Sequence, residues 1–188
     1  MKVCVFGASS NSIDKSYFDK VTELGEKMAK RGHTLVFGGG AQGLMGAVVK
    51  GITAQGGESI GIAPSFFDVD DILYKDGTRL ILTETMAERK KMMEDISDAF
   101  IAVPGGVGTF EEFFEVLTLK QLQQHNKPLA LFNVNNYYDK FEELLAFTVE
   151  AGFMKEECKN VYKIFSSAEE ILTYIENYDE TNENVLKY

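Results

Sequence analysis

Residues 104–112, PGGVGTFEE, have the composition of an anion-binding turn. Gly105, Gly106 and Gly108 let the backbone approach a ligand closely, and Thr109 adds a hydroxyl group. A helix is expected to follow, and its unpaired N–H groups and dipole favour negative charge. The stretch is neither a Walker loop, because no lysine follows the last glycine, nor a G-x-G-x-x-G motif. It therefore predicts a phosphate site rather than a dinucleotide site.

The glutamate that ends this stretch, Glu112, has two interpretations. Thr109-x-x-Glu112 fits a helix capping box, in which the glutamate binds the backbone N–H of the capping threonine. The same signature occurs at Thr85-x-x-Glu88 and Ser167-x-x-Glu170. One glycine is enough for a turn, however, so three glycines within four residues favour a ligand site in which Glu112 is a functional carboxylate.

A second glycine-rich stretch, GGGAQGLMG at residues 38–46, also has two interpretations. It could contact a ligand, or it could form a tight turn with close helix–strand packing at Gly43 and Gly46. The residue types alone leave both possibilities open.

Arg89, Lys90 and Lys91 form the one concentrated basic cluster. They lie near the start of an expected helix, where a cation opposes the helix dipole, and a bound anion would offset that cost. Three cations suit a small phosphate ligand better than a polyanion. The net charge of −10 also disfavours binding to nucleic acid.

Short β-rich segments alternate with longer segments of helical periodicity. Strands are expected at residues 2–6, 34–37, 58–63, 79–83, 99–103, 128–133 and 161–165. Helices are expected at residues 16–31, 44–55, 86–97, 110–125, 138–151 and 167–178, with a loop at 64–77. This order predicts an α/β fold of three layers, α/β/α, around a mainly parallel sheet of about seven strands. Residues 1–178 are expected to form a single domain, and residues 179–188 a polar C-terminal tail.

Right-handed connections place the loop after each strand at the carboxyl edge of such a sheet, where ligands bind. Four stretches are expected at this edge: residues 7–10, residues 38–40, the helical turn that holds Arg89, and residues 104–112. We therefore expect them to lie close together.

Composition also bears on membrane insertion, disulfide bonding and metal binding. No apolar segment approaches the roughly 20 residues of a membrane span, and the N-terminal MKVCVF resembles a strand more than a signal peptide. Two cysteines, Cys4 and Cys158, allow no disulfide framework and indicate a reducing, cytoplasmic location. His33 and His125 have no metal-site spacing, so we expect no metal.

The expected helix at 110–125 carries apolar residues on more than one face, which indicates deep burial or a subunit interface. We favour a symmetric homodimer. The residues concerned are Phe110, Phe113, Phe114, Val116, Leu117, Leu119 and Leu122.

Three motifs in this order, GGGAQGLMG, ERK (88–90) and PGGVGTFEE, resemble those of the LOG-type proteins. These are cytokinin riboside 5′-monophosphate phosphoribohydrolases, long mislabelled as lysine decarboxylases. The resemblance spans about residues 2–175. It implies a Rossmann-like fold, usually dimeric, that hydrolyses the N-glycosidic bond of a nucleoside 5′-monophosphate such as AMP or an N6-modified AMP. The products would be the free base and ribose 5-phosphate, and no cofactor would be required.

The resemblance also implies roles for individual residues. Arg89 and Glu112 match the family's catalytic pair. The residues expected to bind substrate are Lys90, Gly105, Gly106, Val107, Gly108, Thr109, Phe110, Glu111, Thr118, Gly39, Gly40 and Met45. Ala87 and Val107 depart from the histidine and tyrosine that are common at these places, which bears on the preferred base.

The chemistry of glycosidic cleavage fits these residues. Cleavage develops oxocarbenium character on the ribose, which a nearby carboxylate such as Glu112 would stabilise. Arg89 would bind the phosphate or sugar. One alternative is a non-catalytic carrier of a nucleotide or a molybdopterin-like cofactor. Another is an amino-acid decarboxylase, which would need a Schiff-base lysine with a pyridinium partner.

Overall fold

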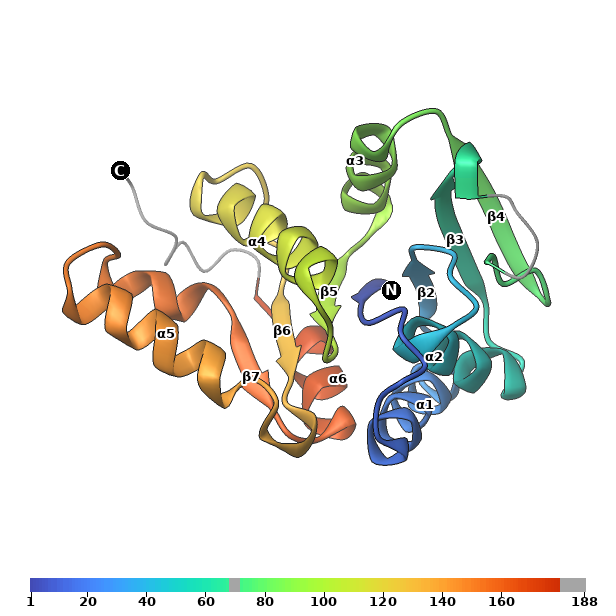
Figure 1. Ribbon diagram of the computed structural model, residues 1–188, viewed down its shortest axis with the longest axis horizontal. Coiled ribbons are helices and arrows are strands. Elements are labelled where there is room, and N and C mark those ends of the chain that lie inside the picture. Colours follow the sequence, from blue (N-terminus) through green and yellow to red (C-terminus); the bar gives the residue numbers. More distant parts are fainter. Residues whose placement is uncertain (68–71, 180–188) are drawn as a thin grey trace.

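Seven parallel strands form one sheet in the order β4-β3-β2-β1-β5-β6-β7 in the computed structural model, which describes residues 1–67 and 72–179 (Figure 1). The strands are β1 Lys2–Phe6, β2 Thr34–Phe37, β3 Ser59–Pro64, β4 Thr78–Thr83, β5 Ala99–Ala102, β6 Leu129–Phe132 and β7 Lys163–Phe165. Every neighbouring pair is parallel. The predicted α/β fold with a parallel sheet of about seven strands is confirmed.

Within the described residues, six α-helices cover the two faces of the sheet (Figure 1). On one face lie α1 Lys15–Lys30, α2 Gly43–Ala54 and α6 Ala168–Glu176. On the other lie α3 Met86–Ile96, α4 Val107–Gln121 and α5 Asp139–Glu150. Short 3₁₀ turns occupy Ser65–Phe67, Val134–Asn136 and Glu156–Val161.

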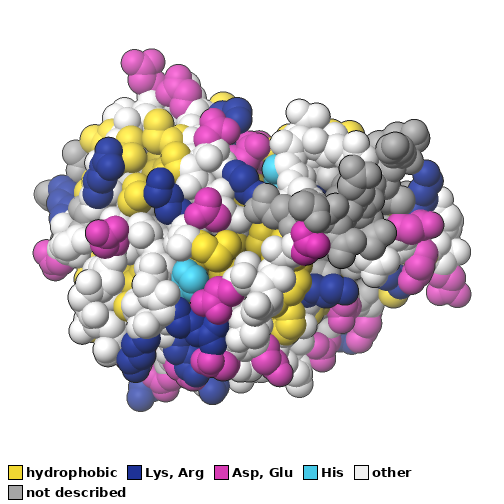
Figure 2. All heavy atoms as spheres, turned by 180° about the vertical axis from the view of Figure 1, so that it is seen from behind, with side chains coloured by type: hydrophobic (Ala, Val, Ile, Leu, Met, Phe, Trp, Pro, Cys, Tyr) yellow, Lys and Arg dark blue, Asp and Glu magenta, His cyan; other side chains and the backbone are white. Residues whose placement is uncertain are grey.

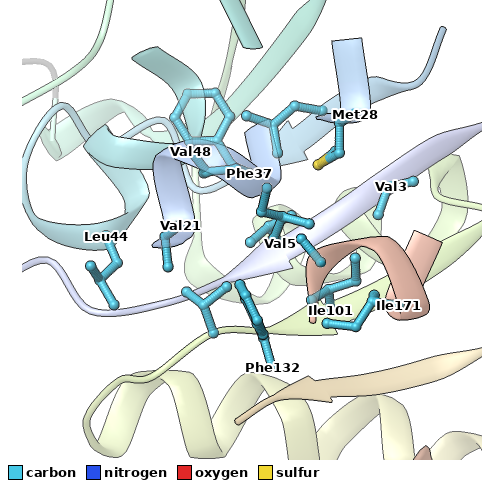
Figure 3. Packing of buried hydrophobic residues seen from close by; sticks show 14 of the residues in the cluster. Val3, Val5, Val21, Met28, Phe37, Leu44, Val48, Ile101, Phe132 and Ile171 are labelled. Carbon is cyan, nitrogen blue, oxygen red and sulfur yellow. The ribbon is translucent and has the colours of Figure 1, made fainter. Parts of the chain in front are cut away.

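The central strands are apolar throughout because helices bury both of their faces. Val3 and Val5 of β1 point towards the α1, α2 and α6 layer, where Val21, Val48 and Ile171 pack (Figure 3). Alternate residues of β1, Cys4 and Phe6, point into the second core beneath α3 and α4. The sheet is thus a rigid platform whose carboxyl edge can hold a site.

The chain reverses its direction of travel across the sheet at β1. Strands β1 to β4 are added one after another towards one edge, and α3 then carries the chain back to β5, which pairs with the other side of β1. The loops that follow β1 and β5 are consequently neighbours, and Ala8 N–H donates to the Pro104 carbonyl at 3.1 Å. Open α/β sheets bind ligands at such a switch in strand order.

Of the three predicted capping boxes, only that of α3 is present, with Thr85 and Glu88 bonding reciprocally. Ser167 is the N-cap of α6, but its side chain makes no capping hydrogen bond. The capping-box interpretation of Thr109 and Glu112 is wrong because α4 begins three residues earlier than expected, with Gly106 as its N-cap. Thr109 is therefore inside the first turn, and Glu112 is free for another partner.

Two glycines bring α1 and α2 into backbone contact. A Cβ added to Gly25 of α1 would lie 2.2 Å from the Val48 carbonyl oxygen, and one added to Gly51 of α2 would lie 2.2 Å from that of Thr22. Separations this short leave no room for a methyl group on either helix. Each glycine therefore sets the spacing between the two helices.

Gly51→Ala is expected to lower the free energy of unfolding by about 2 kcal/mol, because overpacking outweighs the better helix propensity of alanine. Urea denaturation would measure this. Gly108→Ala is the matched control, since Gly108 is also helical and a Cβ there meets nothing within 4 Å. Equal stability of Gly51→Ala and the unsubstituted protein would contradict the close contact.

Charged side chains of both signs are interspersed over the face in Figure 2. In the part of the chain that the structure describes, no helix is both long and apolar enough to span a bilayer. No group of three or more metal-ligating side chains occurs there either.

Candidate active site

Arg89 is fixed from several sides at the carboxyl edge of the sheet. It lies in the second turn of α3 and is only 6% exposed. Its Nε donates to the Ile62 carbonyl at the end of β3, 3.1 Å away. A Cβ added to Gly38 would lie 2.2 Å from Arg89 Nη2, so the first glycine after β2 makes space for the guanidinium group.

Glu112 of α4 is the partner of this arginine. Its Oε1 accepts a hydrogen bond from Arg89 Nη1 at 2.7 Å, and the exposed fractions of the two side chains are 8% for Arg89 and 14% for Glu112. Burial raises the pKa of Glu112 above its usual value, and the nearby guanidinium group opposes that rise. The Glu112 carboxylate also offsets the unfavourable interaction between the Arg89 cation and the positive end of the α3 dipole.

The Arg89–Glu112 pair borders a cavity of about 320 Å³. The loops after β1, β2 and β3 and the first turn of α2 contribute the rest of its described lining. The lining residues are Gly7, Ser9, Gly38, Gly40, Gln42, Met45, Phe67, Ile72, Leu73, Arg89 and Glu112. The expected convergence of distant stretches at this edge is confirmed for the β1 and β2 loops and for Arg89 and Glu112.

The first turn of α4 lies at the same switch in strand order and has the features of an anion site. Gly106, Val107 and Gly108 are exposed, and the N-cap Gly106 has no side chain to satisfy the first amides. Gly105 is buried, and a Cβ on it would lie 2.0 Å from Thr109 Oγ1. Apart from the Val107 side chain, which is 84% exposed, this turn therefore presents backbone N–H groups.

The first turn of α2 differs, because the chain itself satisfies its amides. Leu44 N–H donates to the Ala8 carbonyl at 2.8 Å, and Gly43 N–H donates to Asn11 Oδ1 at 2.8 Å. A Cβ on Gly43 would lie 2.3 Å from the Ala8 oxygen, and one on Gly46 would lie 2.1 Å from the Ala41 oxygen. The tight-turn interpretation therefore holds at Gly43 and Gly46, although the contacts are with loops rather than with a strand.

The lysines beside Arg89 are paired with carboxylates. Lys90 Nζ bonds Glu111 and lies 3.0 Å from Glu115 Oε2. Lys91 bonds Asp95 on the exposed side of α3. Ion pairs with carboxylates raise the pKa of both lysines, first through these hydrogen bonds. Neither lysine is part of the described cavity lining.

Only some of the predicted substrate-binding residues lie at the cavity. Gly40 and Met45 line the cavity, whereas Gly39, with φ of +77°, forms the adjacent turn. Phe110 packs its ring against those of Tyr138 and Phe141. Thr118 is exposed on α4, about two turns beyond Glu111. Contacts of substrate with any of these residues remain predictions.

Several lining residues were not predicted as site residues. Phe67, Ile72 and Leu73 come from the expected loop at 64–77, of which residues 68–71 lie outside the described residues. Ala41 N–H donates to the Ile72 carbonyl at 2.9 Å, which fixes this loop to the β2 turn. The sequence feature that could have predicted these lining residues is the cluster of apolar and aromatic residues in the loop at 64–77.

Comparison with known proteins gives a consistent family assignment. A family model described as "Possible lysine decarboxylase" matches residues 45–175. The chain is 36% identical to cytokinin riboside 5′-monophosphate phosphoribohydrolase LOG5 of Arabidopsis thaliana, covering 98% of this chain and 81% of LOG5. It is also 36% identical to the LOG enzyme of Oryza sativa subsp. japonica, covering 94% and 73% of the two chains.

Solved structures share the fold. The molybdenum cofactor binding protein of Rippkaea orientalis superposes with a TM-score of 0.69 at 26% identity, covering 93% of this chain and 94% of that one. The Moco carrier protein of Chlamydomonas reinhardtii gives a TM-score of 0.68 at 24% identity, with the same coverage. The sequence relatives, the Arg89–Glu112 pair and the glycine-rich turn agree: the chain belongs to the LOG family of cytokinin riboside 5′-monophosphate phosphoribohydrolases.

Proposed function

We propose that this protein hydrolyses the N-glycosidic bond of a nucleoside 5′-monophosphate, AMP or an N6-modified AMP, to the free base and ribose 5-phosphate. The observation that carries the proposal is the buried Arg89–Glu112 pair beside the cavity, at the edge where α4 begins. Relatives named as phosphoribohydrolases, 36% identical over 98% of the chain, support it.

Glu112 is the group suited to the developing positive charge. A carboxylate near C1′ stabilises an oxocarbenium-like transition state and orients the sugar hydroxyls or the attacking water. Burial raises the Glu112 pKa, so the carboxylate form and the activity are lost as pH falls through a value above that of ordinary glutamates.

The 5′-phosphate is assigned to the first turn of α4. Exposed backbone around Gly106 and Gly108 and the positive end of the helix favour a doubly charged anion. Holding the phosphate there fixes the ribose relative to Glu112, so binding energy is used to orient the reacting carbon. Arg89 is already hydrogen-bonded to Glu112, and it can turn part of its guanidinium group to phosphate or sugar oxygens.

The test is to incubate the protein with nucleosides and with their mono-, di- and triphosphates, and to measure released base and ribose 5-phosphate. Base is expected from monophosphates and not from nucleosides, because nucleosides lack the group that α4 binds. Release from no monophosphate would overturn the proposal.

The same panel separates the two alternatives. A non-catalytic nucleotide or cofactor carrier would bind without releasing base; it is favoured only by the structural neighbours, which show the fold. A pyridoxal-dependent decarboxylase requires a lysine at its site, and the described lining of the cavity includes no lysine.

We also propose a homodimer in the cytoplasm. On α4, Phe113, Val116 and Leu117 are buried, but Phe114 and the C-cap residue Leu122 remain 37% and 47% exposed. Leu82 of β4 and Met86 of α3 are also exposed, by 47% and 39%. Light scattering would test the assembly, with a mass of twice 21.0 kDa expected.

A further inference from the structure

Two adjacent tyrosines bind the turn between β5 and α4. The Tyr138 hydroxyl, which is fully buried, donates to the Val103 carbonyl at 2.8 Å. The Tyr137 hydroxyl donates to the Gly105 carbonyl. With Ala8 N–H on the Pro104 carbonyl, three consecutive carbonyl groups of this turn have donors from other parts of the chain.

Each of these bonds also fixes the direction of an N–H group. The described chain has no cis peptide bond, and in a trans peptide the C=O and the N–H of the next residue point in opposite directions. Holding the Gly105 carbonyl therefore directs the Gly106 N–H away from Tyr137. The bond from Tyr138 to the Val103 carbonyl orients no N–H group, because the next residue is Pro104 and the proline nitrogen carries no hydrogen.

The Gly105–Gly106 peptide is the one most in need of such support. Glycine on both sides offers little steric resistance to rotation of a peptide plane, so this unit can turn its carbonyl towards the anion site instead of its N–H. A carbonyl oxygen in that place would repel a phosphate group. The hydroxyl of Tyr137 opposes this rotation.

The position of Tyr137 is itself well determined. Its ring packs edge-on against Tyr17 at 6.3 Å and against Tyr138 at 5.1 Å. The 3₁₀ turn before it is anchored to α1 by Asn135 Nδ2, which donates to Ser16 Oγ at 2.7 Å. A tyrosine hydroxyl is protonated at neutral pH and can donate, and burial raises the pKa of the Tyr137 hydroxyl further above its usual value.

We propose that Tyr137 is a positioning residue for the phosphate site: its hydroxyl holds the Gly105–Gly106 peptide with the Gly106 N–H directed at the 5′-phosphate. Tyr137 does not touch the reacting bond and acts through the backbone. The inference rests on the proposed function, because it assigns the phosphate to the first turn of α4.

Tyr137→Phe removes only the hydroxyl and tests this role. Titration calorimetry with AMP and with adenosine is the main measurement. It is made in the Glu112→Gln background, so that AMP is not hydrolysed during the titration, and both probes bind through the same base and sugar. AMP is expected to bind about tenfold more weakly, because one backbone donor to a charged group is lost, while adenosine affinity stays unchanged. In steady-state assays with AMP, KM should rise with little change in kcat.

Tyr138→Phe is the matched control. It also removes a hydroxyl that binds a carbonyl of the same turn, but the peptide concerned has no N–H to direct. Its midpoint of urea denaturation should fall because a buried carbonyl loses its donor, while its ratio of AMP to adenosine affinity stays as in the unsubstituted protein.

The outcomes separate the inference from the proposed function. A selective loss of AMP affinity in Tyr137→Phe supports the inference even if no base is ever released, which would overturn only the enzymatic function. Equal losses for AMP and adenosine, an unchanged AMP affinity, or the same loss in Tyr138→Phe would overturn the inference while base release by the unsubstituted protein stands. If the unsubstituted protein binds AMP no better than adenosine, the phosphate assignment and the inference both fail.

Discussion

Glu112→Gln is expected to lower kcat for base release by on the order of 10²–10³-fold, the range for removing one preorganised electrostatic group from a site. The substitution keeps the size of the side chain and an oxygen that can accept from Arg89 Nη1, so the fold is expected to persist. It removes the negative charge that stabilises an oxocarbenium-like ribose. Single-turnover assays with AMP would measure the rate, and calorimetry would measure AMP binding, which should largely survive.

Glu115→Gln is the control for this experiment. Glu115 is on the same helix, is 39% exposed and bonds Lys90, so its charge is removed without changing the Arg89 pair. Its rate should stay close to that of the unsubstituted protein. The acid limb of the pH–rate profile provides a second check, since Glu112→Gln should lack the limb that titration of a raised-pKa carboxylate produces. A normal rate in Glu112→Gln would remove Glu112 from the mechanism.

Arg89→Met is expected to destabilise the folded protein by about 3–5 kcal/mol at neutral pH, the usual cost of breaking a buried ion pair from one side. The variant leaves the Glu112 carboxylate buried without its partner and deprives the Ile62 carbonyl of its donor. Base release should be lost as well. Urea denaturation at several pH values would measure the change in stability.

The pH dependence of that loss has a definite sign. Arg89 lowers the pKa of Glu112 against the effect of burial, so its removal raises the folded-state pKa further above the unfolded value. A group whose pKa is higher in the folded than in the unfolded state stabilises the folded protein at low pH, and that contribution is lost as pH rises through the folded-state pKa. The penalty of Arg89→Met should therefore be smaller in acid and grow towards neutrality.

Two comparison variants make this prediction specific. The double variant Arg89→Met/Glu112→Gln should be less destabilised than Arg89→Met, because no buried charge is left unpaired. Arg79→Met, at an exposed arginine of β4, should stay within about 0.5 kcal/mol of the unsubstituted protein. If Arg89→Met were as stable as Arg79→Met, the buried pair would contribute nothing.

The order of elements was predictable because each strand and helix carries its own periodicity. Val3 and Val5 alternate with Cys4 and Phe6, and both sets are buried, as a strand between two helical layers requires. The start of α4 was not predictable in this way. Helix boundaries depend on local backbone geometry, and a glycine N-cap leaves no side-chain signature, whereas Thr109 and Glu112 fit a capping box that the structure does not form.

Parts of the candidate site were predictable because their residue types are unusual for their positions in a turn or helix. The turn before α4 has more glycines than a turn requires, and Arg89 is a cation near the start of a helix, where the dipole disfavours it. Topology and the family resemblance predicted that Arg89 and Glu112 lie close together. Their direct hydrogen bond needed the three-dimensional structure, because it depends on how the two side chains are oriented at the sheet edge. Ile72 and Leu73 were missed since ordinary apolar side chains line the cavity as readily as they fill a core.

The ion pairs at α3 have a consequence for the speed at which substrate arrives. Arg89, Lys90 and Lys91 each bond a carboxylate, and the chain as a whole carries a charge of −10. A dianionic nucleotide therefore meets no excess of positive potential from this cluster as it diffuses up to the protein. Its encounter rate gains nothing from long-range attraction and should not fall as ionic strength rises, unlike that of enzymes whose clefts guide their substrates electrostatically.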